Sequence, residues 1–289
     1  MAKKGKWRML WRNLKFLMRT DLRFGLADMS GCRCKFADML KTTRMPDIRD
    51  FEETAKILAE TDASIARFGD GEFTLMQGRG IPFQRADAQL AARLAGILAK
   101  PPPGCLVGVP RLCWFDDRRF AEHDNLWWLR YMKTNGTWLE AHMDAAATYF
   151  DSFVSLFSRA TVPGYDVGGM FDCLRRIWDG KDVLVVCGQG IFDGFEHDVF
   201  DNAQSVEFVY GPKRDAWGVY DTLLAQVKAA AKGRVVLVVL GPTATVMAAD
   251  LAAAGIRALD LGHLAKAYNA FRTGADRSGK AAKTFYKAD

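Results

Sequence analysis

The stretch that decides the fold reads "RVVLVVLGPTATVMAADLAAAGIRALDL" and spans residues 234–261. It opens with a short apolar strand, 234–240, and closes with a second one, 256–261. Between them lies an alanine-rich helical segment, 243–254, which Gly255 terminates. A strand, a helix and a strand in this order predict two parallel strands joined by a crossover helix.

The same alternation continues toward the amino terminus. Apolar runs predict four more strands, at residues 63–68, 105–110, 182–187 and 205–210. Helical spacing predicts four more helices, at residues 50–62 with Asp50 as N-cap, 86–100, 194–202 and 215–231. The aromatic-rich residues 114–160 predict helices and loops. We therefore expect an α/β protein with a mainly parallel sheet that helices cover on both faces.

The composition is that of an ordinary globular protein with a sizeable core. Hydrophobic residues make up 49% and charged residues 26% of the chain. No aliphatic run exceeds strand length, so the sequence predicts no membrane span. Cys105 and Cys187 lie in apolar runs as core thiols, and the isolated pair Cys32 and Cys34 has no second pair at zinc-ligand spacing. Sparse cysteines predict a reducing, cytoplasmic location.

The basic charge of the chain is concentrated in residues 1–25. They carry eight Lys or Arg and one acidic residue, a net charge of +7, whereas the whole chain carries +6. Apolar residues, among them Trp7 and Trp11, recur there at helical spacing. The pattern predicts a basic amphipathic helix, either peripheral at the inner face of the membrane or packed on its own domain. The nearly neutral remainder argues against a nucleic-acid partner.

Two predicted strand ends carry glycines that suit a phosphate group. The run "LGPTAT" (240–245) places Gly241 in a turn and Thr243 at the start of a helix. The run "CGQG" (187–190) offers Gly188 for close approach of the backbone to an anion. This second run leaves open a nicotinamide cofactor and hence a dinucleotide-dependent oxidoreductase.

A third strand end carries positive charge. In "GPKRDAW" (211–217), Lys213 and Arg214 directly follow a predicted strand. Two readings stay open: these side chains neutralise a diphosphate, or they face solvent.

The run "SIARFGDGE" (64–72) places two carboxylates after a predicted strand. Along an extended chain, residues two apart point the same way, so Asp70 and Glu72 would converge on one cation, with Gly69 leaving room for it. Oxygen ligands of this kind suit Mg²⁺ or Mn²⁺. A plain Asp-Gly turn is the alternative.

Together these stretches resemble one family. The segments "SIARFGDGE", "IPFQRADAQLAARL" and "VVLVVLGPTATVMAADLAAAGIRALDLGH" follow the order found in the GT-D-fold glycosyltransferases. The resemblance implies a Rossmann-like GT-D domain over residues 50–272, with a basic N-terminal extension at 1–49 and a polar C-terminal tail at 273–289. It also implies transfer of a hexose from a nucleotide-sugar donor, a UDP-sugar, to a bacterial glycan or glycoprotein.

The family pattern also implies roles for individual residues. Asp70 and Glu72 occupy the D-x-E motif that holds Mn²⁺ or Mg²⁺. The expected donor-binding residues are Arg67, Gly69, Gln84, Asp87, Gly188, Lys213, Arg214, Gly241 and Thr243.

The resemblance is weakest after the last strand. Family members continue with "G-H-x-D-x-E-Y", whereas this chain has Ala265 and Ala267 at the carboxylate positions. His263 and Asp260 are the catalytic candidates that remain in this region. A second pair, His197 and Asp198, offers the same chemistry in "FEHDVF". The two alanines also keep open a non-catalytic, membrane-associated binding module of the same fold.

Overall fold

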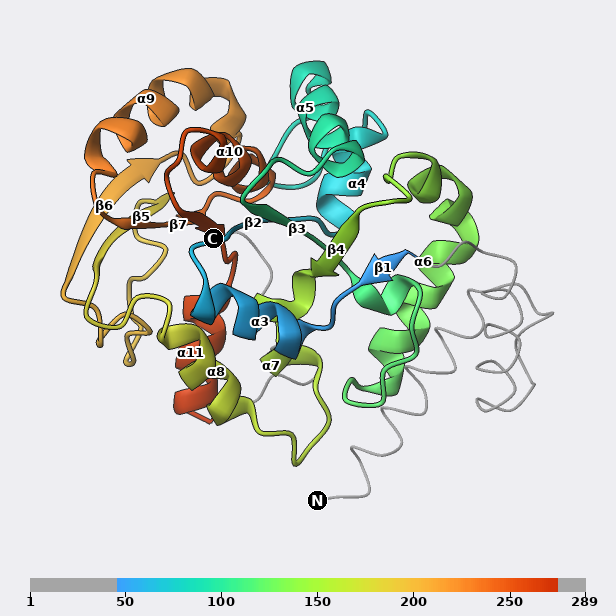
Figure 1. Ribbon diagram of the computed structural model, residues 1–289, viewed down its shortest axis with the longest axis horizontal. Helices are drawn as coiled ribbons and strands as arrows, with labels where there is room; N and C mark the ends of the chain where they lie inside the picture. Colours follow the sequence, from blue (N-terminus) through green and yellow to red (C-terminus); the bar gives the residue numbers. More distant parts are fainter. Residues whose placement is uncertain (1–45, 275–289) are drawn as a thin grey trace. The chain divides into compact units, whose positions relative to one another are not determined.

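The computed structural model describes residues 46–274, which contain one eight-stranded sheet with the order β1-β4-β3-β2-β8-β7-β5-β6 (Figure 1). All of its strand pairs are parallel. The strands are β1 (Asp47–Ile48), β2 (Ser64–Arg67), β3 (Cys105–Val109), β4 (Thr148–Asp151), β5 (Asp182–Gly188), β6 (Ser205–Gly211), β7 (Val235–Val239) and β8 (Ala258–Asp260). The parallel α/β fold expected from the sequence is confirmed.

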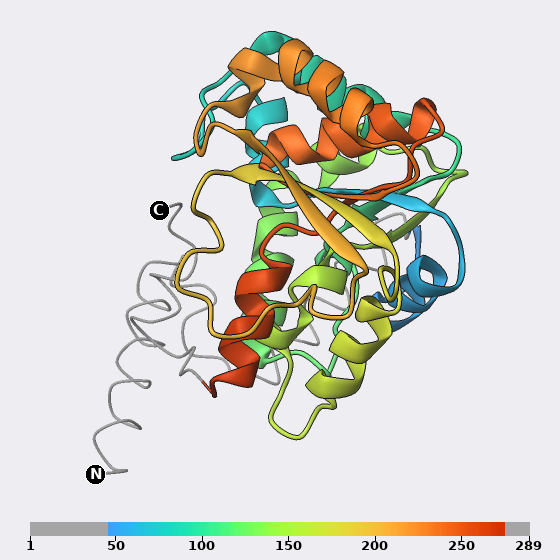
Figure 2. The ribbon, with the colours of Figure 1, turned by 90° about the vertical axis from the view of Figure 1, so that its left-hand side faces the viewer.

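Helices cover both faces of this sheet. The helices on one face are α4 (Asp70–Met76), α5 (Ala88–Ala99), α9 (Tyr220–Ala230) and α10 (Pro242–Ala253) (Figures 1 and 2). Those on the other face are α3 (Phe51–Glu60), α7 (Phe157–Ala160), α8 (Val167–Arg175) and α11 (Leu264–Arg272). The long helix α6 (Glu122–Ala141) follows β3 near the β1 edge.

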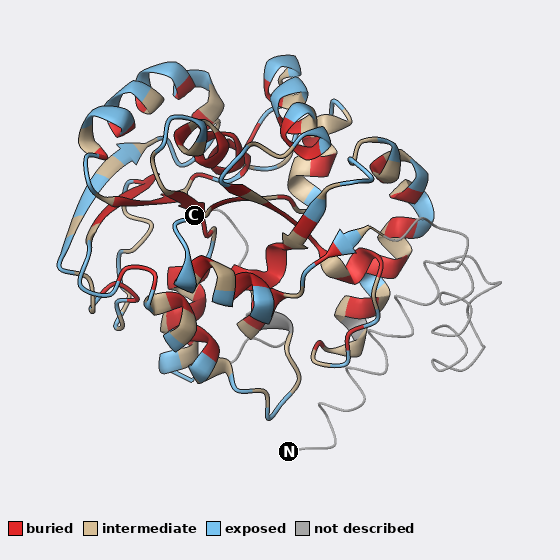
Figure 3. Cartoon of the chain, viewed as in Figure 1, coloured by how far each residue is buried: buried red, intermediate tan, exposed pale blue. Residues whose placement is uncertain are grey.

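The core lies along the middle strands and the helix faces packed on them (Figure 3). Strand β5 is buried from Val183 to Gly188, because a parallel strand in mid-sheet is covered on both faces. Helix α10 is buried around most of its circumference, which explains its small side chains. Strand β6, at the edge of the sheet, alternates between exposed and half-buried residues.

Several parts of the fold differ from the sequence prediction. Residues 194–202 form turns instead of a helix. Side chains explain the difference: Asn269 Oδ1 accepts from the backbone N–H groups of Glu196 and His197 at 2.9 Å, and Asp198 Oδ1 accepts from Phe200 N at 2.8 Å. These bonds compete with the helical ladder. Strand β4 was expected as helix or loop, and β1 lies in residues assigned to the N-terminal extension, so the sheet begins before residue 50.

The basic N-terminal segment, residues 1–25, and the C-terminal tail from residue 275 lie outside the described residues. The amphipathic helix and its membrane contact therefore stay predictions. Within residues 46–274, none of the helices has the length and apolar character that a bilayer crossing requires.

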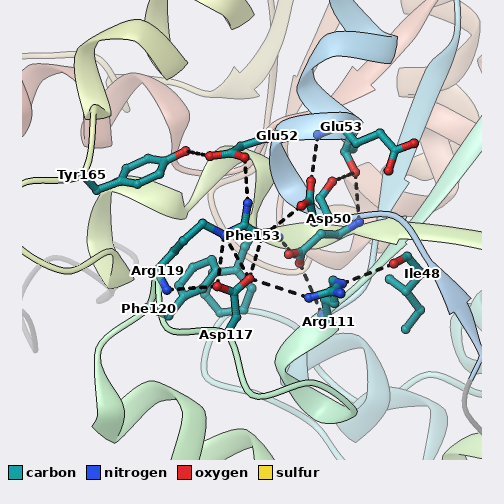
Figure 4. Close-up of polar contacts among 12 residues, drawn as sticks. Ile48, Asp50, Glu52, Glu53, Arg111, Asp117, Arg119, Phe120, Phe153 and Tyr165 are labelled. Carbon is teal, nitrogen blue, oxygen red and sulfur yellow. Dashed lines mark hydrogen bonds and ion pairs between the residues drawn. The ribbon is translucent and has the colours of Figure 1, made fainter.

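Arg119 fastens the loop after β3 to the start of α3 (Figure 4). Its guanidinium donates to Asp117 Oδ2 at 2.6 Å, to Asp50 Oδ2 at 3.0 Å and to Glu52 Oε2 at 2.7 Å. The hydroxyl of Tyr165 donates to Glu52 Oε1 at 2.5 Å. Burial opposes ionisation of Asp117, but its bonds to Arg119 prevail and hold its pKa below the ordinary value. The cluster fixes one border of the sheet's carboxyl edge.

Candidate functional site

The carboxyl ends of the central strands β2 and β8 meet through Arg67 and Asp260. Arg67 Nε donates to Asp260 O at 2.6 Å, and Nη2 donates to Asp260 Oδ1 at 3.1 Å. The hydroxyl of Thr245, in α10, donates to Asp260 Oδ2 at 3.2 Å or to Arg67 O at 2.9 Å. The guanidinium packs against Gly262, where φ is +49° and a Cβ atom would lie 2.2 Å from Nη2. Arg67 is thus committed to the framework of the site.

The two carboxylates of "GDGE" lie in a helix, because α4 begins at Asp70. Gly69 is the N-cap, and Glu72 Oε2 turns back to accept from Gly69 N at 2.7 Å, as in a capping box. The predicted extended geometry is therefore wrong, since residues two apart do not share a helix face. Asp70 is exposed in the first turn, whereas Glu72 points inward.

Burial and charge perturb the inward carboxylates. Burial, with the nearby charge of Asp260, raises the pKa of Glu72 to about 7. Burial also raises the pKa of Asp260, although Arg67 and Thr245 oppose this effect. Carboxyl groups with perturbed pKa values at the carboxyl edge of a sheet are candidates for a functional site.

Gln84 and Asp87 lie beside the N-terminus of α10 and are held by Trp217. Gln84 Oε1 accepts from the hydroxyl of Thr243 at 3.5 Å and from Trp217 N at 3.4 Å. Asp87 Oδ1 caps α5 by accepting from Leu90 N at 2.9 Å and also accepts from the Trp217 indole at 3.0 Å. The structure therefore brings the segment before α5 to "LGPTAT", as the family pattern implies.

The backbone conformation and the surroundings of Gly241 both favour glycine. Its φ is +55°, and a Cβ atom there would lie 3.0 Å from the ring of Phe83. The backbone thus turns sharply between β7 and α10, with a side chain packed against the turn.

Lys213 lies over the "CGQG" turn. A Cβ atom on Gly188 would lie 2.8 Å from Lys213 Cγ, and one on Gly190 would lie 3.8 Å from Lys213 Nζ. The structure therefore joins Gly188 to Lys213 at the ends of β5 and β6. Arg214 is exposed next to them. An exposed ammonium over a glycine turn is suited to neutralising a phosphate.

The residues around the start of α11 fall into two groups. His263 is the exposed N-cap of the helix. Ala265 and Ala267 are buried, and they contribute to the core. Of the two catalytic candidates, Asp260 is engaged by Arg67 and Thr245, while His263 faces outward.

Sequence reasoning missed Asp151, which ends β4 at the same edge of the sheet. The side chain is fully buried, and Oδ1 accepts from Phe153 N at 3.0 Å and from Arg111 N at 3.3 Å. Oδ2 has no hydrogen-bond partner. Burial raises the pKa of Asp151 to about 7. The sequence signal for this residue is an acid that follows the short apolar run "TYF" (148–150), but the sequence pattern did not predict strand β4.

The fold and this edge define the class: a parallel α/β protein with a polar site at the carboxyl ends of its strands. A family model described as "Glycosyltransferase GT-D fold" matches residues 65–287. The chain therefore belongs to the GT-D-fold glycosyltransferase family.

Relatives agree with this assignment. The chain is 32% identical over 242 residues to "Probable glycosyl transferase Gly" of Streptococcus gordonii, covering 82% of this chain and 35% of the relative. It is 29% identical over 257 residues to "Glycosyltransferase GlyD" of Streptococcus pneumoniae, covering 86% of this chain and 30% of the relative. The chain thus spans about a third of the length of these curated relatives.

Solved structures show the same fold. A domain of unknown function described as having "a distinct glycosyltransferase fold" superposes with a TM-score of 0.77 at 32% identity, covering 83% of this chain and 86% of that one. A "New Glycosyltransferase" from Streptococcus sanguinis gives a TM-score of 0.75 at 31% identity, covering 80% and 86%.

Proposed function

We propose that the chain is a metal-dependent hexosyltransferase that uses a nucleotide-sugar donor, a UDP-sugar, and a bacterial glycan or glycoprotein acceptor. The observation that carries the proposal is the meeting of the two family motifs at one edge, where Arg67 of "RFGDGE" binds Asp260 of the last strand. Family membership favours this reaction over a dinucleotide-dependent oxidoreductase.

Asp70 and Glu72 would hold Mn²⁺ or Mg²⁺ once the Glu72 carboxylate releases Gly69 N and turns toward Asp70 at the start of α4. Within residues 46–274, no three His, Cys, Asp or Glu side chains lie close enough to hold a metal ion. Two carboxylates with the donor's phosphates and water nevertheless form a coordination set that these cations accept. When bound, the cation supplies positive charge to the leaving diphosphate.

The remaining residues bind and orient the donor. Lys213 over Gly188 offers a positive charge for the diphosphate, and the dipole of α10, whose exposed N-cap is Gly241, would add to it, whereas Thr243 itself is buried. Gln84 and Asp87 fix the segment that closes this corner. His263, exposed at the start of α11, is the residue we assign to accept the proton of the acceptor hydroxyl.

The reaction would take place in the cytoplasm, with residues 1–25 in peripheral contact with the inner face of the membrane. The competing proposal is a membrane-associated binding module that has lost turnover, and Ala265 and Ala267 are the residues that favour it.

A donor panel tests the proposal. UDP-, GDP- and dTDP-sugars are titrated by calorimetry with Mn²⁺ or with EDTA, and hydrolysis of each donor is followed. We expect binding and slow hydrolysis of a UDP-sugar that EDTA abolishes. Binding without hydrolysis or transfer would support the binding module, and failure of every donor to bind would refute the transferase.

A further inference from the structure

A pocket of about 190 Å³ shares none of its lining residues with the proposed donor corner. Its walls come from the turns after β5, the edge strand β6 and the start of α11. The residues that matter for its chemistry are Phe192, Phe195, His197, Asp198, Phe208 and Ala265. The small side chain of Ala265 leaves this volume open.

Aromatic rings line the pocket, and one of them, Phe208, projects from the edge strand β6. Phe208 is 41% exposed, and its ring lies 5.9 Å from that of Phe192 and 5.7 Å from that of Tyr210. Tyr210 is itself 53% exposed. Large aromatic side chains left in contact with water at a concave surface mark a ligand site.

Polar groups complete the pocket. His197 is half-buried and Asp198 is exposed, and both line the same hollow as the rings. An imidazole and a carboxylate bind hydroxyl groups, while aromatic faces pack against apolar C–H surfaces. A pyranose ring presents both kinds of surface, and a hollow of this volume holds one such ring.

The pocket is tied to the site on two sides. The segment that forms it leaves β5 at the "CGQG" turn, where Lys213 packs against Gly188. Asn269 of α11 accepts from the N–H groups of Glu196 and His197, so the segment is fixed to the helix that begins after His263. A saccharide in the pocket would therefore lie next to the donor corner and the proposed base.

We propose that this pocket binds one pyranose unit of the acceptor saccharide, with Phe208 as the stacking face and Asp198 as a hydroxyl acceptor. The role of this saccharide as acceptor rests on the proposed function, whereas saccharide binding rests on the pocket alone.

Ligand-observed NMR tests the pocket on the full chain. The probes are methyl β-glucopyranoside, methyl β-galactopyranoside and N-acetylglucosamine, each titrated with and without UDP. We expect saturation transfer to at least one probe, and Phe208→Ala should weaken its binding about tenfold. Asp198→Asn keeps the oxygen that accepts from Phe200 N and removes the charge, and it should also weaken binding about tenfold.

Val219→Ala, which trims another exposed apolar side chain outside the pocket, is the matched control and should change nothing. Thermal unfolding of each variant establishes that the fold is kept. No contact with any probe, or equal binding by wild type and both pocket variants, would overturn the proposal. Calorimetry with UDP and Mn²⁺ separates the two failures: UDP binding without saccharide contact refutes only the pocket, and saccharide contact without UDP binding refutes only the transferase.

Discussion

Arg67 and Asp260 clamp the two central strands together by two bonds from one guanidinium, to the carbonyl and to the carboxylate of the same residue. The two residues are 193 positions apart. The clamp explains how the first and last motifs of the family come to form one site. It also gives Arg67 a positioning role at the strand ends, and the expectation that Arg67 binds the donor stays a prediction.

Breaking this clamp should destabilise the fold. Asp260→Asn leaves a half-buried guanidinium without its counter-charge, and we expect the free energy of unfolding to fall by about 3 kcal/mol. Urea denaturation measures the change. Asp62→Asn is the control, because Asp62 is exposed and its pairing with Arg257 at 3.4 Å should contribute little. Equal effects of the two variants would contradict the importance of the clamp.

Gly262 should tolerate no side chain. Gly262→Ala combines a φ of +49° with a Cβ atom 2.2 Å from Arg67 Nη2, so it should displace the guanidinium. Gly255→Ala has a φ of +74° and no atom within 4 Å, so it isolates the backbone strain, about 1 kcal/mol. We expect a clearly larger loss of thermal stability for Gly262→Ala than for Gly255→Ala. Similar losses in the two variants would show that the Arg67 guanidinium can move aside without cost.

The two motif carboxylates should separate binding from stability. Asp70→Asn removes an exposed charge from the first turn of α4 and should abolish Mn²⁺-dependent UDP binding in calorimetry, while it lowers the free energy of unfolding by about 1 kcal/mol or less. Glu72→Gln keeps an oxygen that accepts from Gly69 N and should also abolish Mn²⁺-dependent UDP binding. Its thermal stability at neutral pH should stay equal or rise, because the substitution removes a buried charge. Glu53→Gln, in the exposed first turn of α3, is the control. Retained Mn²⁺ dependence in both motif variants would refute the metal assignment.

Asp151 should make stability depend on pH. Its pKa is about 7 in the fold and 3.8 in the unfolded chain, so between these values the folded state binds more protons. Stability therefore falls as pH rises, by on the order of 2–4 kcal/mol between about pH 4 and about pH 7. Urea denaturation across this range should show a flatter dependence for Asp151→Asn than for wild type, and an unchanged slope for exposed Asp172→Asn. Parallel curves for wild type and Asp151→Asn would disprove the assignment.

Lys213 should contribute affinity and little stability. Lys213→Ala removes an exposed ammonium beside Gly188, and we expect UDP to bind about tenfold more weakly with a reduced dependence on salt. The matched control is Lys228→Ala, which removes the same charge from an exposed lysine on α9. An identical loss in both variants would show a general effect of net charge rather than a local contact.

Much of the architecture follows from local sequence pattern. The strands β5 and β7 are apolar runs because both faces are covered, and the helices α3 and α10 carry their start signals at Asp50 and Pro242. Such features depend on neighbours along the chain. The sequence therefore predicts the parallel sheet, the helices on both faces and the edge where the motifs meet.

The remaining features depend on contacts between distant residues. The helix beginning at Asp70 is set by Gly69 and Glu72, but a strand followed by a glycine pair also fits an extended turn. The turns at 194–202 are imposed by Asn269, 72 residues beyond His197. The burial of Asp151 depends on β3 and β4 pairing, and four residues of "TYFD" give too short a period to identify a strand.

The buried alanines of α11 limit which side chains the family's two carboxylate positions can accommodate in this chain. Where the family pattern has carboxylates, Ala265 lines an open pocket and Ala267 lies in the core with almost no contact with water. A glutamate at position 267, where the family pattern has one, would bring an unpaired charge into apolar packing. Introducing both carboxylates of the family pattern would therefore require neighbouring residues to change as well, because the packing of α11 is built on small buried side chains at these positions.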